Sequence, residues 1–139
     1  MRDENCIFCK IANGEIPSRT IYEDDDFRII LDLNPATRGH ALIVSKNHYK
    51  NLYELDDGIA SKVLPLAKKM AHHMQEKLKC DGFNLIQNNN EIAGQTVFHF
   101  HMHLIPRYKD DNQSFVMSPG NPEIIKDEDI DKVRDMLNS

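Results

Sequence analysis

The chain has 139 residues, of which 40% are hydrophobic and 28% are charged, and its formal net charge is −5. This length and composition predict one globular domain with a single sizeable core. The acidic balance excludes a dedicated nucleic-acid coat, which needs a basic face, and no apolar run is long enough to span a membrane.

The N-terminus and the cysteines predict the compartment. The first ten residues, MRDENCIFCK, contain acids and no apolar stretch, so they do not resemble a secretory signal. Three cysteines, an odd number without an export signal, are typical of a reducing environment. We therefore expect a cytoplasmic protein that has neither a membrane nor a nucleic acid as partner.

The pattern of apolar residues predicts an α+β fold with a largely antiparallel sheet. Between residues 56 and 79 the apolar positions recur at intervals of three and four, which is typical of an amphipathic helix, although Pro65 should kink or restart it. Acids at 127–129 suggest the start of a short C-terminal helix. Strands are expected over 20–23, 27–32, 40–45, 82–88 and 97–106.

The first distinctive motif is CIFC, in which Cys6 and Cys9 have the spacing of zinc sites and of redox pairs. A redox pair usually lies where a strand meets a helix in a βαβ unit, and this pattern is missing around the motif. Two thiolates leave a tetrahedral zinc ion two ligands short, and histidines are available to complete it. A free, reduced pair in a turn is the alternative.

The second motif, HFHMHLIPR, places His99, His101 and His103 at alternate positions. Since side chains alternate along a strand, the three imidazoles should share one face while Phe100, Met102 and Leu104 share the other. This regular pattern favours function over a solvated strand face, and either metal binding or chemistry on a phosphate or acyl group would suit it. The outer pair of histidines is too far apart to share a zinc ion easily.

The segment before the histidines, NNNEIAGQTV, favours the phosphate interpretation. Its amide and hydroxyl side chains can donate hydrogen bonds, and Gly94 would let backbone N–H groups approach an anion closely. A loop of donors that leads into a row of histidines suits a phosphoryl centre.

The segments GHALIVSKNH and NNNEIAGQTVFHFHMHLIPR together resemble the histidine triad (HIT) family, in particular its short Hint-like branch. The family hallmark alternates three histidines with apolar residues and ends on two apolar positions, and residues 99–105 match it throughout. Matches at CIFCKI, GEIP and ILDLNP extend the resemblance towards the N-terminus. The resemblance implies a single HIT domain over residues 1–139, with about five antiparallel strands, one long helix and a short C-terminal helix.

The resemblance implies nucleotidyl transfer or hydrolysis at the α-phosphate of purine nucleoside monophosphate esters or amides. His101 would attack phosphorus to form a nucleotidyl-histidine, His99 and His103 would flank the phosphate, and His40 would orient or protonate. The implied substrate-binding residues are Asp32 at the ribose, Ile30 and Leu33 near the base, and Asn88, Gln95, Thr96 and Val97 around the phosphate.

Short Hint-like proteins that contain the cysteine pair resemble zinc carriers. The matching ligands are Cys6, Cys9, His48 and His99, which would form a closed, structural site that ties residues 1–15 to the sheet. The chemistry itself would need no cofactor. The resemblance also implies a homodimer in which two five-stranded sheets form one continuous sheet.

Three other functions stay open at the level of sequence. A dinucleoside polyphosphate hydrolase would use the same chemistry on another substrate. A nucleotide-binding adaptor or sensor would hydrolyse only incidentally. A metal-dependent oxygenase would use the three histidines as metal ligands, and stripping its metal would abolish catalysis.

Overall fold

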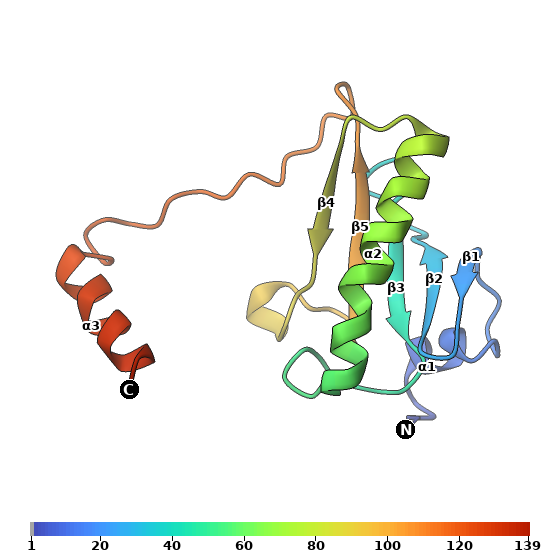
Figure 1. Cartoon of the computed structure of the whole chain (residues 1–139), viewed down its shortest axis with the longest axis horizontal. Helices are drawn as coiled ribbons and strands as arrows, with labels where there is room; N and C mark the ends of the chain where they lie inside the picture. The colour runs from blue at the N-terminus through green and yellow to red at the C-terminus, as the bar shows by residue number, and fades with distance from the viewer. Residues whose placement is uncertain (1) are drawn as a thin grey trace.

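The computed structural model describes residues 2–139, so Met1, the first residue of the expected domain, lies outside the described residues. Its centre is a five-stranded antiparallel sheet with a helix on each face (Figure 1). The strand order is β1-β2-β3-β5-β4. The strands are β1 (Thr20–Glu23), β2 (Phe27–Leu31), β3 (Ala41–Ser45), β4 (Gly82–Ile86) and β5 (His101–Arg107). The predicted α+β fold with an antiparallel sheet is confirmed.

One face of the sheet is covered by the long helix α2 (Asp57–Leu78), as Figure 1 shows. The Asp56 side chain caps its first turn by accepting a hydrogen bond from the Ile59 N–H, and Lys79 ends it in a left-handed conformation. Its apolar stripe packs on the sheet to form the main core, in which the buried helix residues are Val63, Leu66, Ala67, Met70 and Met74.

The expected restart at Pro65 is wrong, because one helix runs through this position. Pro65 lies on the exposed side of α2, one turn after the exposed Ser61. Because proline has no backbone N–H, the Ser61 carbonyl has no hydrogen-bond donor within the helix at this position. Water can satisfy that carbonyl there, so the helix continues.

The other face of the sheet carries a smaller apolar cluster. Short helix α1 (Ile7–Ala12) contributes Ala12, with Phe8 packed beside it, and the cluster also contains Leu42 and Val44 of β3. Two other residues of β3, Ala41 and Ile43, belong to the main core below α2. Alternation along β3 therefore separates two environments, as the period of a strand requires.

The last predicted strand is shorter than expected and begins later. Residues 97–99 form a bend, and β5 starts only at His101. His99 therefore lies outside the regular strand. The predicted common face nevertheless holds, because the rings of His99 and His101 both contact Phe8 of α1. The backbone N–H of Phe100 donates instead to the Tyr49 carbonyl (2.7 Å), so this segment is bound to the loop after β3.

Beyond β5 the chain leaves the sheet as a long arm that ends in helix α3 (Asp127–Leu137), the predicted C-terminal helix (Figure 1). Before β5 there is a single turn of 3₁₀ helix, η1 (Glu91–Ala93). Among residues 2–139, no helix combines the length and the apolar character needed to cross a membrane.

Candidate functional site

His101 and His103 lie side by side on the α1 face of the sheet. The register of β3 and β5 pairs Val44 with His101 and Leu42 with His103, so the two imidazoles stand over the smaller apolar cluster. Their ring centroids are 5.2 Å apart. Phe8 of α1 meets the His101 ring edge-on, with 5.0 Å between centroids. The two imidazoles therefore pack on the smaller apolar cluster, called the floor of the site below, and Phe8 lies beside them.

The tautomer of His101 follows from its backbone contact. Its Nδ1 lies 2.7 Å from the carbonyl oxygen of His99, and a carbonyl can only accept, so Nδ1 carries the proton. The other nitrogen, Nε2, makes no hydrogen bond within residues 2–139. It also reaches solvent, since Arg28 Nε is the one buried side-chain nitrogen or oxygen that lacks a partner in the described chain. His101 thus presents an open lone pair.

A second chain of contacts sets the tautomers of His40 and His103. The Ala36 N–H donates to His40 Nδ1 (2.9 Å), so the proton of neutral His40 is on Nε2. This Nε2–H donates to His103 Nδ1, again at 2.9 Å. His103 consequently carries its own proton on Nε2, the nitrogen that is free. His101 and His103 therefore offer opposite groups to the same space, a lone pair and an N–H.

Asp32 joins this group from the end of β2. Its carboxylate lies 3.5 Å from His40 Nε2, and its backbone N–H donates to the His40 carbonyl (2.9 Å). The turn that carries His40 is fastened to β5 by the Thr37 hydroxyl, which donates to the Pro106 carbonyl. Gly39 allows this approach, because its φ is +90° and a Cβ atom there would lie 2.5 Å from Leu78 Cδ1.

Burial keeps these imidazoles neutral. Desolvation lowers the pKa of His101 and of His40, against the opposing effect of the Asp32 carboxylate. Desolvation, together with repulsion from His101 and His40 whenever these rings are protonated, lowers the pKa of His103 to about 4. Neutral rings are the ones to which the tautomers above apply.

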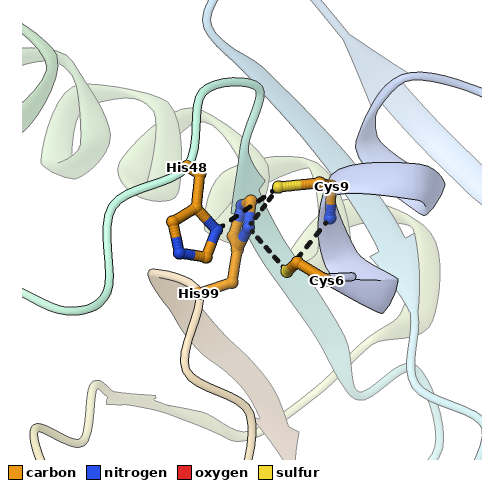
Figure 2. Close-up of side chains that lie close together, drawn as sticks. All are labelled: Cys6, Cys9, His48 and His99. Atoms are coloured by element: carbon orange, nitrogen blue, oxygen red, sulfur yellow. Dashed lines mark hydrogen bonds between the residues drawn. The ribbon is translucent and has the colours of Figure 1, made fainter. Parts of the chain in front are cut away.

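The remaining histidine of the motif belongs to a different cluster, which Figure 2 shows. His99 Nδ1 lies 3.3 Å from Cys6 Sγ and 3.4 Å from Cys9 Sγ, and His48 Nδ1 lies 3.3 Å from Cys9 Sγ. The four ligand atoms all lie within 4.8 Å of one another. The predicted set of Cys6, Cys9, His48 and His99 is thus brought together.

The cluster fits a tetrahedral zinc ion. Bonds of ~2.3 Å to sulfur and ~2.0–2.1 Å to nitrogen give sulfur–nitrogen separations of roughly 3.5 Å, close to the observed values. Backbone N–H groups of Cys9 and Asp3 donate to Cys6 Sγ and Cys9 Sγ, both at 3.4 Å. Burial raises the pKa of the Cys9 thiol, so a bound metal ion would have to displace its proton. Zinc would find two sulfurs and two nitrogens here, the donor set typical of closed structural sites.

His99 is fully buried, and neither ring nitrogen points to the open space beside His101. Nε2 lies 2.7 Å from the Ser45 carbonyl oxygen, which fixes the proton there and leaves the Nδ1 lone pair for the cluster. The backbone carbonyl of His99, by contrast, holds His101. His99 therefore meets the two sites through two different groups, a ring nitrogen and a carbonyl oxygen.

The predicted phosphate loop is arranged less simply than its sequence suggests. Gln95 is buried, with Oε1 accepting from the Asn90 N–H (2.8 Å) and Nε2 donating to the carbonyls of Lys50 (2.7 Å) and Val97 (3.1 Å). Its amide is fully used inside the loop. Thr96 is exposed, and Asn88 lies against Gly94, where the chain turns with φ +97°.

The two apolar residues expected near the base differ in their surroundings. Ile30 is 5% exposed and belongs to the floor of the site, whereas Leu33 is 80% exposed.

Sequence reasoning missed three contributors: Phe8, Ser45 and Ala36. Phe8 is hidden inside the cysteine motif, and a polar residue that ends a buried strand was the available signal for Ser45. The Ala36 N–H gives no side-chain signal at all.

A five-stranded antiparallel sheet that carries paired histidines beside a buried histidine–cysteine cluster defines a small α+β protein of the histidine triad class. The chain belongs to the HIT family, because the HIT domain model matches residues 13–110. The resemblance drawn from the motifs is confirmed.

Relatives of known name support this membership. The chain is 46% identical over 105 residues to Protein hit of Bacillus subtilis, covering 76% of this chain and 72% of that protein. It is 35% identical over 136 residues to adenosine 5′-monophosphoramidase hnt1 of Schizosaccharomyces pombe, with 97% of each covered. The chain is accordingly an enzyme of this family.

Solved structures share the fold. A HIT family protein from Bacillus anthracis matches with a TM-score of 0.87 and 36% identity, covering 97% of this chain and 96% of the other. A zinc-bound histidine triad protein from Mycobacterium smegmatis matches with a TM-score of 0.76 and 38% identity, over 86% of each chain.

Proposed function

We propose that the protein hydrolyses nucleoside monophosphate amides and esters at the α-phosphate, through a nucleotide bound covalently to His101. The observation that carries this proposal is the fixed tautomer of His101, with Nδ1–H held by the His99 carbonyl and Nε2 open. A neutral imidazole nitrogen with a free lone pair is a nucleophile at physiological pH. The relative named adenosine 5′-monophosphoramidase supports an amide as substrate.

In the first step, His101 Nε2 forms a bond to phosphorus as the bond to the leaving group breaks. The anionic phosphate raises the pKa of the neighbouring His103, so that its imidazolium can protonate the departing amine. The positive charge that develops on His101 is stabilised by the His99 carbonyl, which accepts its Nδ1–H.

Once the imidazolium of His103 has given its Nε2 proton to the amine, Nε2 has a free lone pair. In the second step this nitrogen accepts a proton from the water that hydrolyses the nucleotidyl-histidine. In the resting enzyme His40 acts as a positioning residue, because its Nε2–H orients the His103 ring. His99 contributes its backbone carbonyl and not its ring, although the motif suggests a ring beside the phosphate.

The nucleoside would lie over the apolar floor next to the histidines. Phe8 and Ile30 supply flat apolar contact for a purine, with the exposed Leu33 at the rim, and Asp32 can accept hydrogen bonds from the ribose hydroxyls. Asn88 and the Thr96–Val97 backbone would hold phosphate oxygens. Gln95 would shape this loop from inside, since its amide is already used.

We further propose that zinc occupies the cluster of Cys6, Cys9, His48 and His99 as a structural ion, and that two chains form a homodimer in the cytoplasm. The donor set and its spacing support zinc, as does the zinc-bound relative. Zinc would tie residues 2–15 to the sheet and supply no step of the chemistry.

Steady-state hydrolysis of an adenosine amide and of a diadenosine polyphosphate tests the function. We expect turnover of an adenosine 5′-phosphoramidate to exceed that of a diadenosine polyphosphate. Comparable or faster cleavage of the diadenosine compound would favour the polyphosphate hydrolase, and binding of adenosine monophosphate without hydrolysis of either would favour the adaptor. The purine preference is measured with the matching guanosine and cytidine amides.

A further inference from the structure

The resting contacts of His103 hold a tautomer that the proposed reaction does not use. The His40 Nε2–H donates to His103 Nδ1 at 2.9 Å, so the resting ring carries its proton on Nε2. The imidazolium of His103 has a second proton on Nδ1, and the ring keeps that proton after Nε2 has protonated the amine. During both steps of the reaction, His103 Nδ1 is therefore a donor and can no longer accept a hydrogen bond.

His40 cannot accept a hydrogen bond from this new donor. Its Nδ1 accepts from the Ala36 backbone N–H (2.9 Å), and a backbone N–H only donates, so the proton of neutral His40 stays on Nε2. Two N–H groups would then face each other at a contact where His40 is only 6% exposed. Because buried donors without an acceptor are costly, the protonated ring of His103 needs another acceptor nearby.

The carboxylate of Asp32 lies beside this contact. Its Oδ2 lies 3.5 Å from His40 Nε2. One carboxylate oxygen of Asp32 and one ring nitrogen each of His40 and His103 all lie within 4.8 Å of one another. Oδ1 accepts from the Asn34 N–H (2.8 Å), whereas Oδ2 accepts no hydrogen bond from residues 2–139 in the resting structure. Oδ2 therefore has lone pairs available for an N–H that turns towards it.

The backbone fixes this carboxylate before any nucleoside binds. The Asp32 N–H donates to the His40 carbonyl at 2.9 Å, and the bond from the Asn34 N–H holds the side chain. A charge-assisted hydrogen bond is ~2.7–2.9 Å long, so a small movement of either side chain would close the gap to Oδ2. The negative charge of Asp32 already opposes the burial that lowers the pKa of His40, His101 and His103.

We propose that Asp32 is the counter-ion of His103 during the reaction and accepts the N–H groups that can no longer pair between His103 and His40. This inference rests on the proposed function and deepens it, because it gives Asp32 a part in protonating the leaving group besides its contact with the ribose. Asp32 acts through His103 and is a positioning residue for this acid. It should matter most in the first step when the leaving group needs a proton.

Single-turnover cleavage with saturating enzyme isolates the first step and tests this role. The substrates are the phosphoramidate and the nitrophenyl ester of 2′,3′-dideoxyadenosine monophosphate, which offer no ribose hydroxyl to Asp32. Asp32→Asn removes the charge and keeps an oxygen for the Asn34 N–H, and Glu76→Gln removes one charge from the exposed side of α2 as the control. We expect Asp32→Asn to slow amine release by roughly tenfold or more and nitrophenolate release by less than about threefold. Glu76→Gln should change neither rate.

The ester reaction also verifies that the Asp32→Asn variant is folded. An equal loss with both leaving groups, or no loss with the amide, would overturn the proposal. The same two derivatives of adenosine are measured in parallel. Cleavage of the adenosine amide but not of the dideoxy amide by the wild type would make the ribose contact essential to the step and would contradict a separate role of Asp32. A wild type that cleaves none of the four substrates would overturn the proposed function, and this role with it.

The same substitution in the His103→Ala background tests whether Asp32 acts through His103. We expect Asp32→Asn to slow release of the amine by less than about twofold in this background, because the ring that Asp32 would support is missing. A loss as large as in the wild-type background would show that Asp32 acts on another group and would overturn the proposal.

Discussion

Two neighbouring groups of histidines use their ring nitrogens in opposite ways. In the cysteine–histidine cluster, both nitrogens of His99 face protein atoms, Nε2 the Ser45 carbonyl and Nδ1 the two sulfurs. In the other group, His101 and His103 each have one nitrogen fixed by the protein and one left open. Under the proposed roles, an imidazole becomes structural or reactive according to what its second nitrogen meets, although the motif spaces the three residues evenly.

Removing the open nitrogen of His101 should have the largest effect. We expect His101→Ala to lower kcat for an adenosine phosphoramidate by ~10⁴-fold, because no other group can form the covalent intermediate. The matched control is His73→Ala on the exposed side of α2, which should retain full activity. Circular dichroism would verify that both variants are folded. Retention of more than a tenth of the wild-type rate by His101→Ala would contradict the assigned role.

A change in the closed cluster should act on stability first. We expect Cys9→Ser to lower the free energy of unfolding by about 3–5 kcal/mol, because a buried metal ligand is lost. Metal content per chain, measured by mass spectrometry, should fall with it. The control Cys80→Ser changes a buried cysteine outside the cluster and should leave the metal content unchanged. Unaltered metal content in Cys9→Ser would refute the site.

His103→Ala should have a smaller effect than His101→Ala, and one that depends on the leaving group. For an amine leaving group we expect a fall in kcat of ~10²-fold, since proton donation contributes about that much. A nitrophenolate ester needs little protonation and should lose much less. An equal loss with both substrates would mean that His103 binds the phosphate without acting as an acid.

The lowered pKa of His103 predicts a modest dependence of stability on pH. In the unfolded chain His103 has the ordinary histidine pKa of ~6.5, whereas in the folded chain its pKa is lowered to about 4. The free energy of unfolding should therefore decrease as the pH falls from about 6.5 towards 4. Urea unfolding at several pH values would measure the slope, and His103→Gln should reduce it. An unchanged slope in that variant would contradict a neutral His103.

Much of the fold could be predicted from the sequence because its elements have clear periods. The continuous apolar run in ALIVS and the three-to-four spacing along α2 give β3 and the main helix almost to the residue. The restart predicted at Pro65 was wrong, because the helix propensity of proline contains no information about which side of the helix faces water. The late start of β5 could not be predicted either. The alternation of histidines and apolar residues includes His99, which lies in the bend before the strand begins.

The residues of the site were predictable in type and only partly in role. The motifs located the cysteine pair and both groups of histidines. The residues of each site come from segments that are far apart along the chain. The roles depend on backbone groups such as the Ala36 N–H and the His99 carbonyl, which every residue possesses and no sequence pattern marks. Gln95 shows the same limit, because its amide could bind a phosphate or brace a loop, and only its surroundings decide.

The distinction between open and closed imidazoles is tested most directly by the covalent intermediate. The protein is mixed briefly with an adenosine phosphoramidate, quenched in base and digested, and the modified peptide is fragmented in a mass spectrometer. The account predicts one adenylyl group on His101, which is absent from His101→Ala, and none on His99 or His103. Turnover without any adduct, or an adduct on His99, would contradict it.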